Sequence, residues 1–241
     1  MDESFSSLPT SYLLGSVPAV VSEEKTPSSQ DDGDEQQLTN NWKGVFSISS
    51  YTQYFNVDTD VVLNRLISSL YPISGDFFSK IDANPDLYGL VWISTTLVFA
   101  IASLGNCATY LMHRRSDHST SWTFDVSYLN VAACSIYGYV LIVPLAYYFL
   151  LQYLGSNASL IRFWCLWGYS LFIFILSSFL LVIPFEFLRW TIILLVGGAS
   201  ASFVALNLRS YINESEITIV VISAFILQMG LAIFIKMWFF A

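Results

Sequence analysis

The apolar residues of this chain gather in five long segments that follow a polar N-terminal part. Crossing the hydrocarbon core of a bilayer, about 30 Å thick, takes about 20 apolar residues in a helix. The segments that reach this length are, approximately, 89–112, 128–151, 163–184, 190–208 and 217–235. Each is predicted to be helical, because unpaired backbone groups cannot face lipid. The pattern predicts an all-α integral membrane protein with five transmembrane helices.

Two short amphipathic helices are predicted before the first span. In the first, apolar residues recur at i, i+1, i+4, i+5 and i+8, so they share one side of a helix that Asp58-Thr59-Asp60 can cap. These residues are Val62, Leu63, Leu66, Ile67 and Leu70. The second helix carries Phe77, Phe78 and Ile81 after a predicted cap at Asp76.

The charges of these two helices indicate what the apolar stripes pack against. Four acidic side chains accompany two basic ones, so attraction to anionic lipid is expected to be weak. The charged residues are Asp58, Asp60, Asp76 and Asp82, with Arg65 and Lys80. We expect the stripes to pack on the protein's own membrane helices, with docking onto a partner protein as the alternative.

The net charge of −8 belongs to the part of the chain before the membrane. Residues 1–86 hold 13 of the 18 acidic side chains and four of the ten basic ones. This acidity argues against a nucleic-acid partner, whose phosphates need a basic surface. We divide the chain into a disordered acidic tail (1–40), an amphipathic pre-membrane segment (41–86) and a five-span membrane domain (87–241). Docking of the tail onto a partner is the alternative to a solvated tail.

No group of residues suits catalysis, a metal or a cofactor. His113 and His118 share a loop with Asp117 and Asp125, but a zinc site needs three or four fixed ligands and this loop offers no rigid frame. The three cysteines lie inside predicted spans, where a thiol fills space as a small apolar group. They are Cys107, Cys134 and Cys165. We expect no enzymatic activity, no metal and no cofactor.

A small membrane transporter or channel is the alternative class, and it normally places ionisable residues at mid-depth. Here Lys236 lies near a span end, from which it can reach the interface, and Glu186 and Arg189 belong to a tight turn. The polar residues inside spans suffice for hydrogen bonds between helices. They include Asn106, Asn130 and Gln228. A lipid-handling or membrane-shaping protein is a further alternative, because paired amphipathic segments beside short hairpins can bend a membrane.

Small residues in two of the spans predict close helix packing. They occupy 197–202 in the fourth span and include Ala132 and Gly138 in the second. We expect them to serve packing within one molecule, with oligomerisation through the fourth span as the alternative. Pro144 predicts a kink in the second span.

Short motifs follow one another from the pre-membrane segment to the fourth span. They are Tyr54–Thr59, Ser69–Pro72, Asn84–Gly89, Gly105-Asn106, Val143–Leu145, Gly168–Phe172, Ile183-Pro184 and Arg189-Trp190. In this order they resemble the Yip (Ypt/Rab-interacting protein) domain family of Golgi membrane proteins. The resemblance covers roughly residues 41–241 and leaves the acidic tail outside. That family usually has proline after the glycine of the third motif, where this chain has Leu90.

The resemblance implies a function as well as a fold. It implies a non-enzymatic adaptor in vesicle-mediated transport between endoplasmic reticulum, Golgi and later compartments. Its implied partners are Rab-type small GTPases and other Yip family membrane proteins, with homo- or hetero-oligomers as an option. The family-motif residues that become candidate partner contacts are Asp86, Leu87, Tyr88, Gly89, Gly168 and Tyr169.

The motif residues also have a structural interpretation, which we place first. Asp86 stands where a carboxylate meets the positive end of a helix dipole, Tyr88 can keep its hydroxyl among headgroups, and Gly89 permits close backbone approach. Gly168 beside Tyr169 is likewise typical of helix packing. Recognition of a partner is the alternative role.

The orientation of the spans does not follow from charge, since three basic residues flank the spans on the N-terminal side and four on the other. The resemblance implies a cytosolic N-terminus and a lumenal C-terminus. The glycosylation sequons at Asn157 and Asn213 both lie on the N-terminal side. We therefore expect both to remain unmodified.

Overall fold

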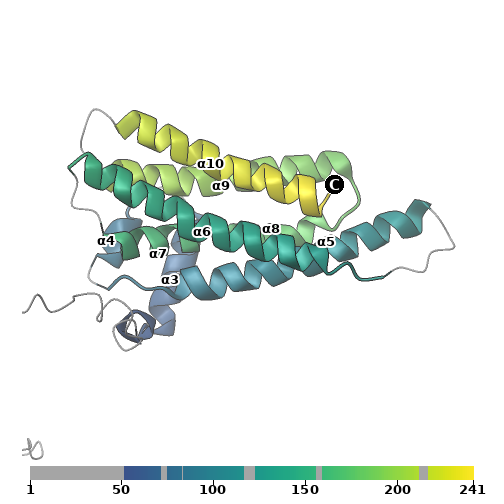
Figure 1. The fold of residues 1–241 in the computed structure, drawn as a ribbon, viewed down its shortest axis with the longest axis horizontal. Coiled ribbons are helices and arrows are strands. Elements are labelled where there is room, and N and C mark those ends of the chain that lie inside the picture. Colours follow the sequence, from purple (N-terminus) through teal and green to yellow (C-terminus); the bar gives the residue numbers. More distant parts are fainter. Residues whose placement is uncertain (1–51, 72–74, 83, 117–122, 156–158, 212–216) are drawn as a thin grey trace, which may run out of the picture. The chain divides into compact units, whose positions relative to one another are not determined.

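The structure, a computed structural model, describes residues 52–71, 75–82, 84–116, 123–155, 159–211 and 217–241. Within these ranges the chain forms helices joined by turns and irregular segments, without a β-strand (Figure 1). The predicted tail, residues 1–40, lies outside the described residues, as do Asn157 and Asn213.

Five helical stretches in the described ranges are long and apolar enough to cross a membrane. They are Gly89–Arg115, Ser127–Tyr153, Leu160–Leu181, Glu186–Arg209 and Thr218–Phe239. Their elements are the π-helix η3 (Gly89–Ile93) with α5 (Ser94–Ser116), α6 (Ser127–Tyr153), α7 (Leu160–Ser170) with α8 (Phe172–Leu181), α9 (Glu186–Tyr211) and α10 (Ile217–Phe239). The predicted all-α class with five spans is confirmed.

The third span is interrupted in its middle, between α7 and α8. The N–H of Leu171 donates to the carbonyl of Gly168 at 3.3 Å, and the N–H of Phe174 donates to that of Leu171 at 3.0 Å. These bonds tighten the chain locally, and the hydroxyl of Ser200 in α9 donates to the carbonyl of Ser170 at 2.7 Å. No proline marks this break. By contrast, α6 continues as one helix through Pro144.

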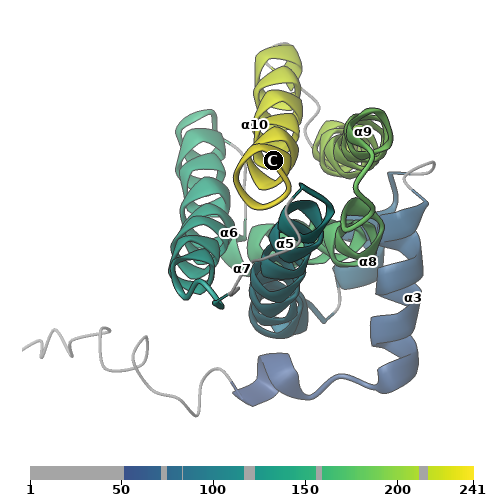
Figure 2. The same ribbon diagram turned by 90° about the vertical axis from the view of Figure 1, so that its right-hand side faces the viewer.

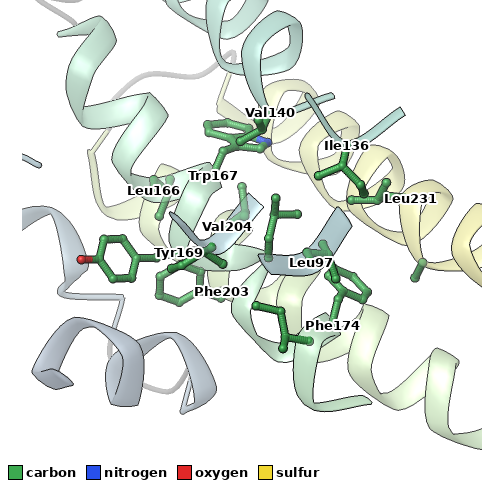
Figure 3. Close-up of a cluster of buried hydrophobic side chains, with 14 of the residues drawn as sticks. Leu97, Ile136, Val140, Leu166, Trp167, Tyr169, Phe174, Phe203, Val204 and Leu231 are labelled. Atoms are coloured by element: carbon green, nitrogen blue, oxygen red, sulfur yellow. The ribbon is translucent and has the colours of Figure 1, made fainter. Parts of the chain in front are cut away.

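The spans meet around a continuous buried cluster (Figure 3). Its centre contains side chains from every span, including Leu97, Ile136, Trp167, Val204 and Leu231. Lipid tails are as apolar as these side chains, so van der Waals packing and interhelical hydrogen bonds hold the bundle together, rather than the hydrophobic effect.

The small residues of the fourth span serve packing within the molecule, as expected. α9 lies alongside α10 (Figure 2). A methyl group on Gly197 would lie 2.6 Å from the Cβ of Ala232 in α10, so a larger residue would push the two helices apart. Gly198, the next residue, has open space where its side chain would be.

The second pre-membrane helix, α4 (Phe77–Ile81), packs on the bundle as predicted. Its three apolar residues are buried, and the Phe77 ring contacts those of Tyr169 and Phe203 at centroid distances of 5.6 and 5.1 Å. Its N-cap residue is Asp76, as predicted, although the side chain makes no capping bond. The N–H of Phe77 donates instead to Oδ1 of Asn207 in α9, at 2.8 Å.

The first pre-membrane helix, α3 (Thr59–Leu70), begins and ends as predicted but buries a different side. Its N-cap residue is Asp58, although the side chain makes no capping bond. Of the predicted apolar stripe, Leu63 and Ile67 are 50% and 60% exposed. Arg65, which the sequence suggested was a surface charge, is only 2% exposed. Arg65 is buried because it pairs with a carboxylate inside the bundle, which the sequence pattern of α3 alone does not reveal.

Candidate functional site

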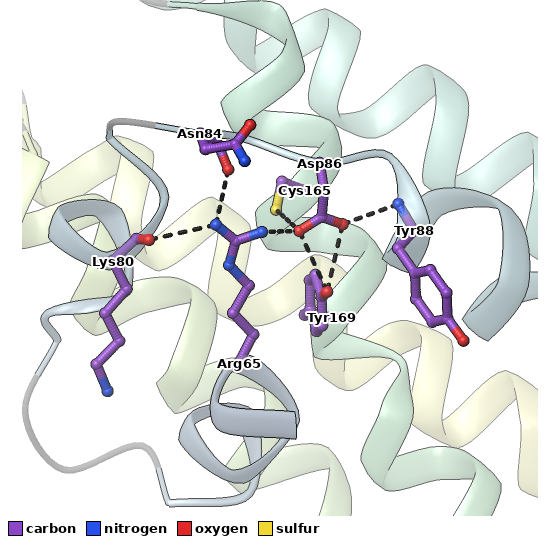
Figure 4. Close-up of polar contacts among 7 residues, drawn as sticks. All are labelled: Arg65, Lys80, Asn84, Asp86, Tyr88, Cys165 and Tyr169. Atoms are coloured by element: carbon purple, nitrogen blue, oxygen red, sulfur yellow. Dashed lines mark hydrogen bonds and ion pairs between the residues drawn. The ribbon is translucent and has the colours of Figure 1, made fainter. Parts of the chain in front are cut away.

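A buried ion pair joins α3 to the segment that leads into the first span (Figure 4). Nη1 of Arg65 donates to Oδ2 of Asp86, and Asp86 is 0% exposed. Nη2 of the same guanidinium donates to the carbonyl of Asn84 at 2.7 Å and to that of Lys80, at the end of α4, at 3.3 Å. One arginine therefore holds three consecutive pieces of the pre-membrane segment together.

The other bonds of the Asp86 carboxylate reach the first and third spans. Its Oδ1 accepts the N–H of Tyr88 at 2.8 Å, at the start of the first span. The Tyr169 hydroxyl of α7 donates to both oxygens, at 3.3 and 3.2 Å, and the Cys165 thiol lies 3.8 Å from Oδ2. We call Arg65, Asp86, Cys165 and Tyr169 the Arg65 node.

Next to the Arg65 node, the first and third spans touch through two glycines. A methyl group on Gly168 would lie 2.5 Å from the carbonyl carbon of Gly89 and 2.5 Å from the backbone nitrogen of Leu90. A methyl on Gly89 would lie 2.9 Å from Cδ2 of Tyr169. All three distances are too short for contact between non-bonded atoms. At both positions, therefore, only glycine fits without displacing the neighbouring atoms. The π-helical turn η3 begins at this contact.

The energy of the Arg65 node depends on both charges being present. Removing water from two ions is costly, and their attraction in a low dielectric compensates only with good geometry and further hydrogen bonds. Four partners surround the carboxylate, while Nε of Arg65 is buried without a hydrogen-bond partner. Loss of either ion alone would leave the other buried and uncompensated.

The structure brings together four of the six predicted family-motif residues, Asp86, Gly89, Gly168 and Tyr169, in the interior. Leu87 is buried as well, and its N–H donates to the carbonyl of Tyr54 at 3.2 Å. Tyr88 differs, because 37% of its surface is exposed and its ring lies 6.3 Å from that of Trp92. Direct contact with a partner is therefore open mainly to Tyr88.

Sequence reasoning missed two members of the node. Arg65 was counted among the surface charges and Cys165 as an apolar filler. A signal for Arg65 was present, because it lies three residues after Val62 and four before Ser69, which places all three on one side of α3. For Cys165 the sequence carried no comparable signal.

A second buried arginine lies at the opposite end of the bundle. Arg189 is 1% exposed and donates to carbonyls that follow α8 and α10. Its acceptors are Val182, Ile183, Phe240 and Ala241, at 2.9 to 3.5 Å. The predicted pair with Glu186 is present at 3.6 Å. Lys236 does not extend to the interface as expected, because it is 4% exposed and pairs with Glu186 at 2.9 Å.

Gln228 makes interhelical hydrogen bonds as the sequence suggested, whereas Asn106 bonds to Ala102 of its own helix and to the backbone of Asp125, and Asn130 is exposed. Gln228 of α10 accepts from the Tyr139 hydroxyl at 2.6 Å and donates to the hydroxyls of Ser200 and Ser170, at 2.7 and 3.1 Å. This network lies at the break in the third span and contains no ionisable carboxylate, amine or guanidinium.

The loop between the first two spans holds the residues that were weighed as metal ligands. His118 and Asp117 lie outside the described residues, and among the residues that are described no three His, Cys, Asp or Glu side chains come together. The backbone of Asp125 pairs with Asn106 through bonds of 2.9 and 3.1 Å. Hydrogen bonds from the side chain and backbone of Ser127 hold the pKa of Asp125 below its usual range.

Comparison with known proteins gives the family to which this arrangement belongs. Residues 66–236 match the Yip1 domain. The chain belongs to the Yip1 family. The match contains Asp86 and both crossing glycines, and it begins one residue after Arg65. This Yip1-family chain is therefore a multi-pass membrane protein, and the resemblance seen in its motifs is confirmed.

Two relatives that match this Yip1-family chain are covered only in part by it. "Protein YIPF1 homolog" of Dictyostelium discoideum is 35% identical over 219 residues, covering 89% of this chain and 60% of that protein. "Protein YIP5" of Schizosaccharomyces pombe is 36% identical over 116 residues, covering 48% of this chain and 45% of that protein. The chain thus spans less than two thirds of either relative. The first alignment also extends into residues 1–40, which the motifs did not reach. No solved structure matches.

Proposed function

We propose that this chain is a non-enzymatic membrane adaptor in vesicle-mediated transport, located in Golgi and endoplasmic reticulum membranes. Its proposed partners are Rab-type small GTPases and other Yip family proteins. Membership of the Yip1 family supports this proposal. The proposed orientation places the N-terminus in the cytosol and the C-terminus in the lumen, with residues 1–40 as an acidic tail and 41–86 as the contact segment.

The observation that carries the proposal is the Arg65 node. A partner-binding segment gains affinity when it is ordered before binding, because less conformational entropy is then lost. Arg65 connects α3, the end of α4 and the start of the first span, so it holds a preformed surface beside the membrane. The exposed ring of Tyr88 belongs to this surface. The pre-membrane part of this surface has a hollow of about 230 Å³, which is lined by Val61, Asn64, Arg65 and Lys80.

The test uses the full chain reconstituted in liposomes and a panel of prenylated Rab-type GTPases. We expect GTPase binding in the wild type and weaker binding for Asp86→Asn, which loosens the surface, and for Tyr88→Ala, which removes an exposed contact. Val126→Ala is the matched control, because Val126 is exposed at the other end of the bundle. Equal binding by all four proteins would contradict the proposed contact segment.

Transport of a small solute is the second candidate, because an interrupted span with polar groups near its middle is common in transporters. The break at Ser170, next to Gln228, is such an arrangement. The hydrogen bonds that the structure shows for the Gln228 side chain all join it to residues of other spans. These bonds leave its polar groups occupied within the bundle instead of facing a cavity. Solute flux through the same liposomes, without GTPase binding, would favour transport over the adaptor.

A further inference from the structure

Helix α3 has three distinct sides, and only one of them faces the bundle. Val62, Arg65 and Ser69 are buried against the protein. The next side around the helix carries Leu63 and Ile67, which are 50% and 60% exposed. The remaining side carries Asn64 and Ser68, exposed and half-buried, together with Val61, which is 39% exposed, while Asp60 borders the apolar side because it lies seven residues before Ile67. An apolar side next to a polar side, both outside the protein contact, is typical of a helix at a membrane interface.

The position of α3 fits the same arrangement. It runs across the direction of the spans rather than along it, beside α8 (Figures 1 and 2). It packs against α7, α8 and α9. Arg65 of α3 is bonded to Asp86, three residues before the first span begins at Gly89, so α3 lies at the N-terminal end of that span.

The surface that adjoins α3 is apolar. α8 exposes large apolar side chains that are expected to face lipid, namely Leu176, Phe179 and Leu180 at 46%, 60% and 51%. Leu63 and Ile67 add to this exposed apolar surface at a helix that touches α8. The charge of Arg65 does not oppose insertion, because it points into the bundle and is paired with Asp86. The acidic side chain of Asp60 lies in the first turn of α3, at the N-terminal edge of the apolar side.

We propose that α3 is an interfacial helix whose Leu63 and Ile67 insert among the lipid acyl chains. Asn64 and Ser68 then face the headgroups and water on the N-terminal side of the membrane. The bilayer is the occupant of the apolar side, because that side adjoins α8, whose exposed apolar side chains are expected to face lipid. The insertion is driven by apolar contact rather than by attraction to anionic lipid, which the acidic residues of the segment oppose. A soluble partner of α3 meets only its polar side.

The test places an environment-sensitive nitrobenzoxadiazole dye on single cysteines at Leu63→Cys, Ile67→Cys, Asn64→Cys and Ser68→Cys. The exposed Cys107 and Cys134 are first replaced by alanine, while the buried Cys165 remains. The full chain is reconstituted in phosphatidylcholine vesicles that contain spin-labelled acyl chains. Quenching by these lipids is compared with quenching by aqueous iodide.

We expect lipid quenching at positions 63 and 67 to exceed that at 64 and 68 several-fold, and iodide quenching to show the opposite order. Equal iodide quenching at all four positions would place the apolar side in water and overturn the proposal. Protection of 63 and 67 from both quenchers would also overturn it, because a second copy or another protein segment would then cover that side. No GTPase is present in this assay, so its outcome is separate from that of the adaptor proposal.

Discussion

The two ends of the bundle each contain a buried arginine, but the two arginines meet different partners. Arg65 faces the carboxylate of Asp86, which is 0% exposed and lies inside the protein. Arg189 faces mainly backbone carbonyls, and its nearest carboxylate, Glu186, is 52% exposed and shared with Lys236. The first arrangement is a closed ion pair, whereas the second is a set of helix-end hydrogen bonds at the edge of the bundle.

This difference determines what each arginine contributes. In the Arg65 node, each buried charge is stable only in the presence of the other. The pair therefore holds the pre-membrane segment against the bundle. At the Arg189 end of the bundle, water can replace part of the ion pairing that Arg189 supplies, because its partner Glu186 is half exposed. We therefore expect substitutions near Arg65 to disturb the protein more than substitutions near Arg189.

The largest effect is expected for Asp86→Leu, which leaves the Arg65 guanidinium buried without its counter-ion. Removal of one member of a buried pair costs about 3–5 kcal/mol of unfolding free energy. The measurement is reversible unfolding of the purified protein in mild detergent. The double variant Arg65→Met/Asp86→Leu is the matched control, because it removes both charges and keeps similar volume. We expect it to recover most of the loss.

If the double variant were as unstable as Asp86→Leu, the charges would not be coupled. The node would then act through shape or through the bonds to Tyr169 and Tyr88 alone. Such a result would also remove the contrast between the two ends of the bundle.

A somewhat smaller effect is expected for Gly168→Ala, next to the Arg65 node. Its methyl group would lie 2.5 Å from the backbone of Gly89, so the first and third spans must move apart. Overpacking of this kind costs about 1–3 kcal/mol. The matched control is Gly198→Ala in the fourth span, where the added methyl meets open space. Equal stability of the two variants in the same unfolding assay would contradict the close crossing.

At the other end, Arg189→Met is expected to cost about 1–2 kcal/mol, because it removes hydrogen bonds to carbonyls at the bundle's edge but leaves Glu186 paired with Lys236. The same unfolding assay compares it with Arg162→Met, whose ion pair with Asp82 is largely exposed and should matter little. A loss as large as that of Asp86→Leu would show that the two arginines are equivalent.

The smallest effect concerns Asp125, in the loop at the Arg189 end. Its pKa is lowered first by the Ser127 side chain, so Ser127→Ala should raise it toward the usual aspartate value of about 3.9. Because the native pKa lies below the unfolded one, the carboxylate stabilises the native state above pH 4 or so and loses this contribution as the pH falls through the lowered pKa. Carboxyl carbon NMR titration gives the value, with Thr123→Ala as the control. An unchanged pKa in Ser127→Ala would contradict the assignment.

The fold was predictable from the sequence because bilayer thickness and backbone hydrogen bonding are strong constraints on any apolar segment. The five spans follow from length alone. The break at Ser170 was not predictable, because neither proline nor a charge marks it and its carbonyl is satisfied by Ser200 from another span. The hydrogen bond that Asn207 accepts from the start of α4 was not predictable for the same reason, since Asn207 is 130 residues away from Phe77.

The candidate site was predictable only as a set of motif residues. Gly89, Gly168 and Tyr169 were singled out separately, and their contact arises from packing between spans 79 or more residues apart in the chain. The sequence pattern of α3 predicted one apolar side, yet Arg65 occupies the buried side because Asp86 is there to receive it. Ion pairs of this kind depend on tertiary structure, which local periodicity does not contain.

The central claim is that the Arg65 node holds the pre-membrane segment on the bundle. Hydrogen–deuterium exchange of the wild type and Asp86→Asn in lipid nanodiscs tests it most directly. We predict faster exchange of the amides of α3 and α4 in the variant, with unchanged exchange in α10, which lies outside the node. Unchanged exchange in α3 and α4 would contradict the claim, because the segment would then stay in place without the ion pair.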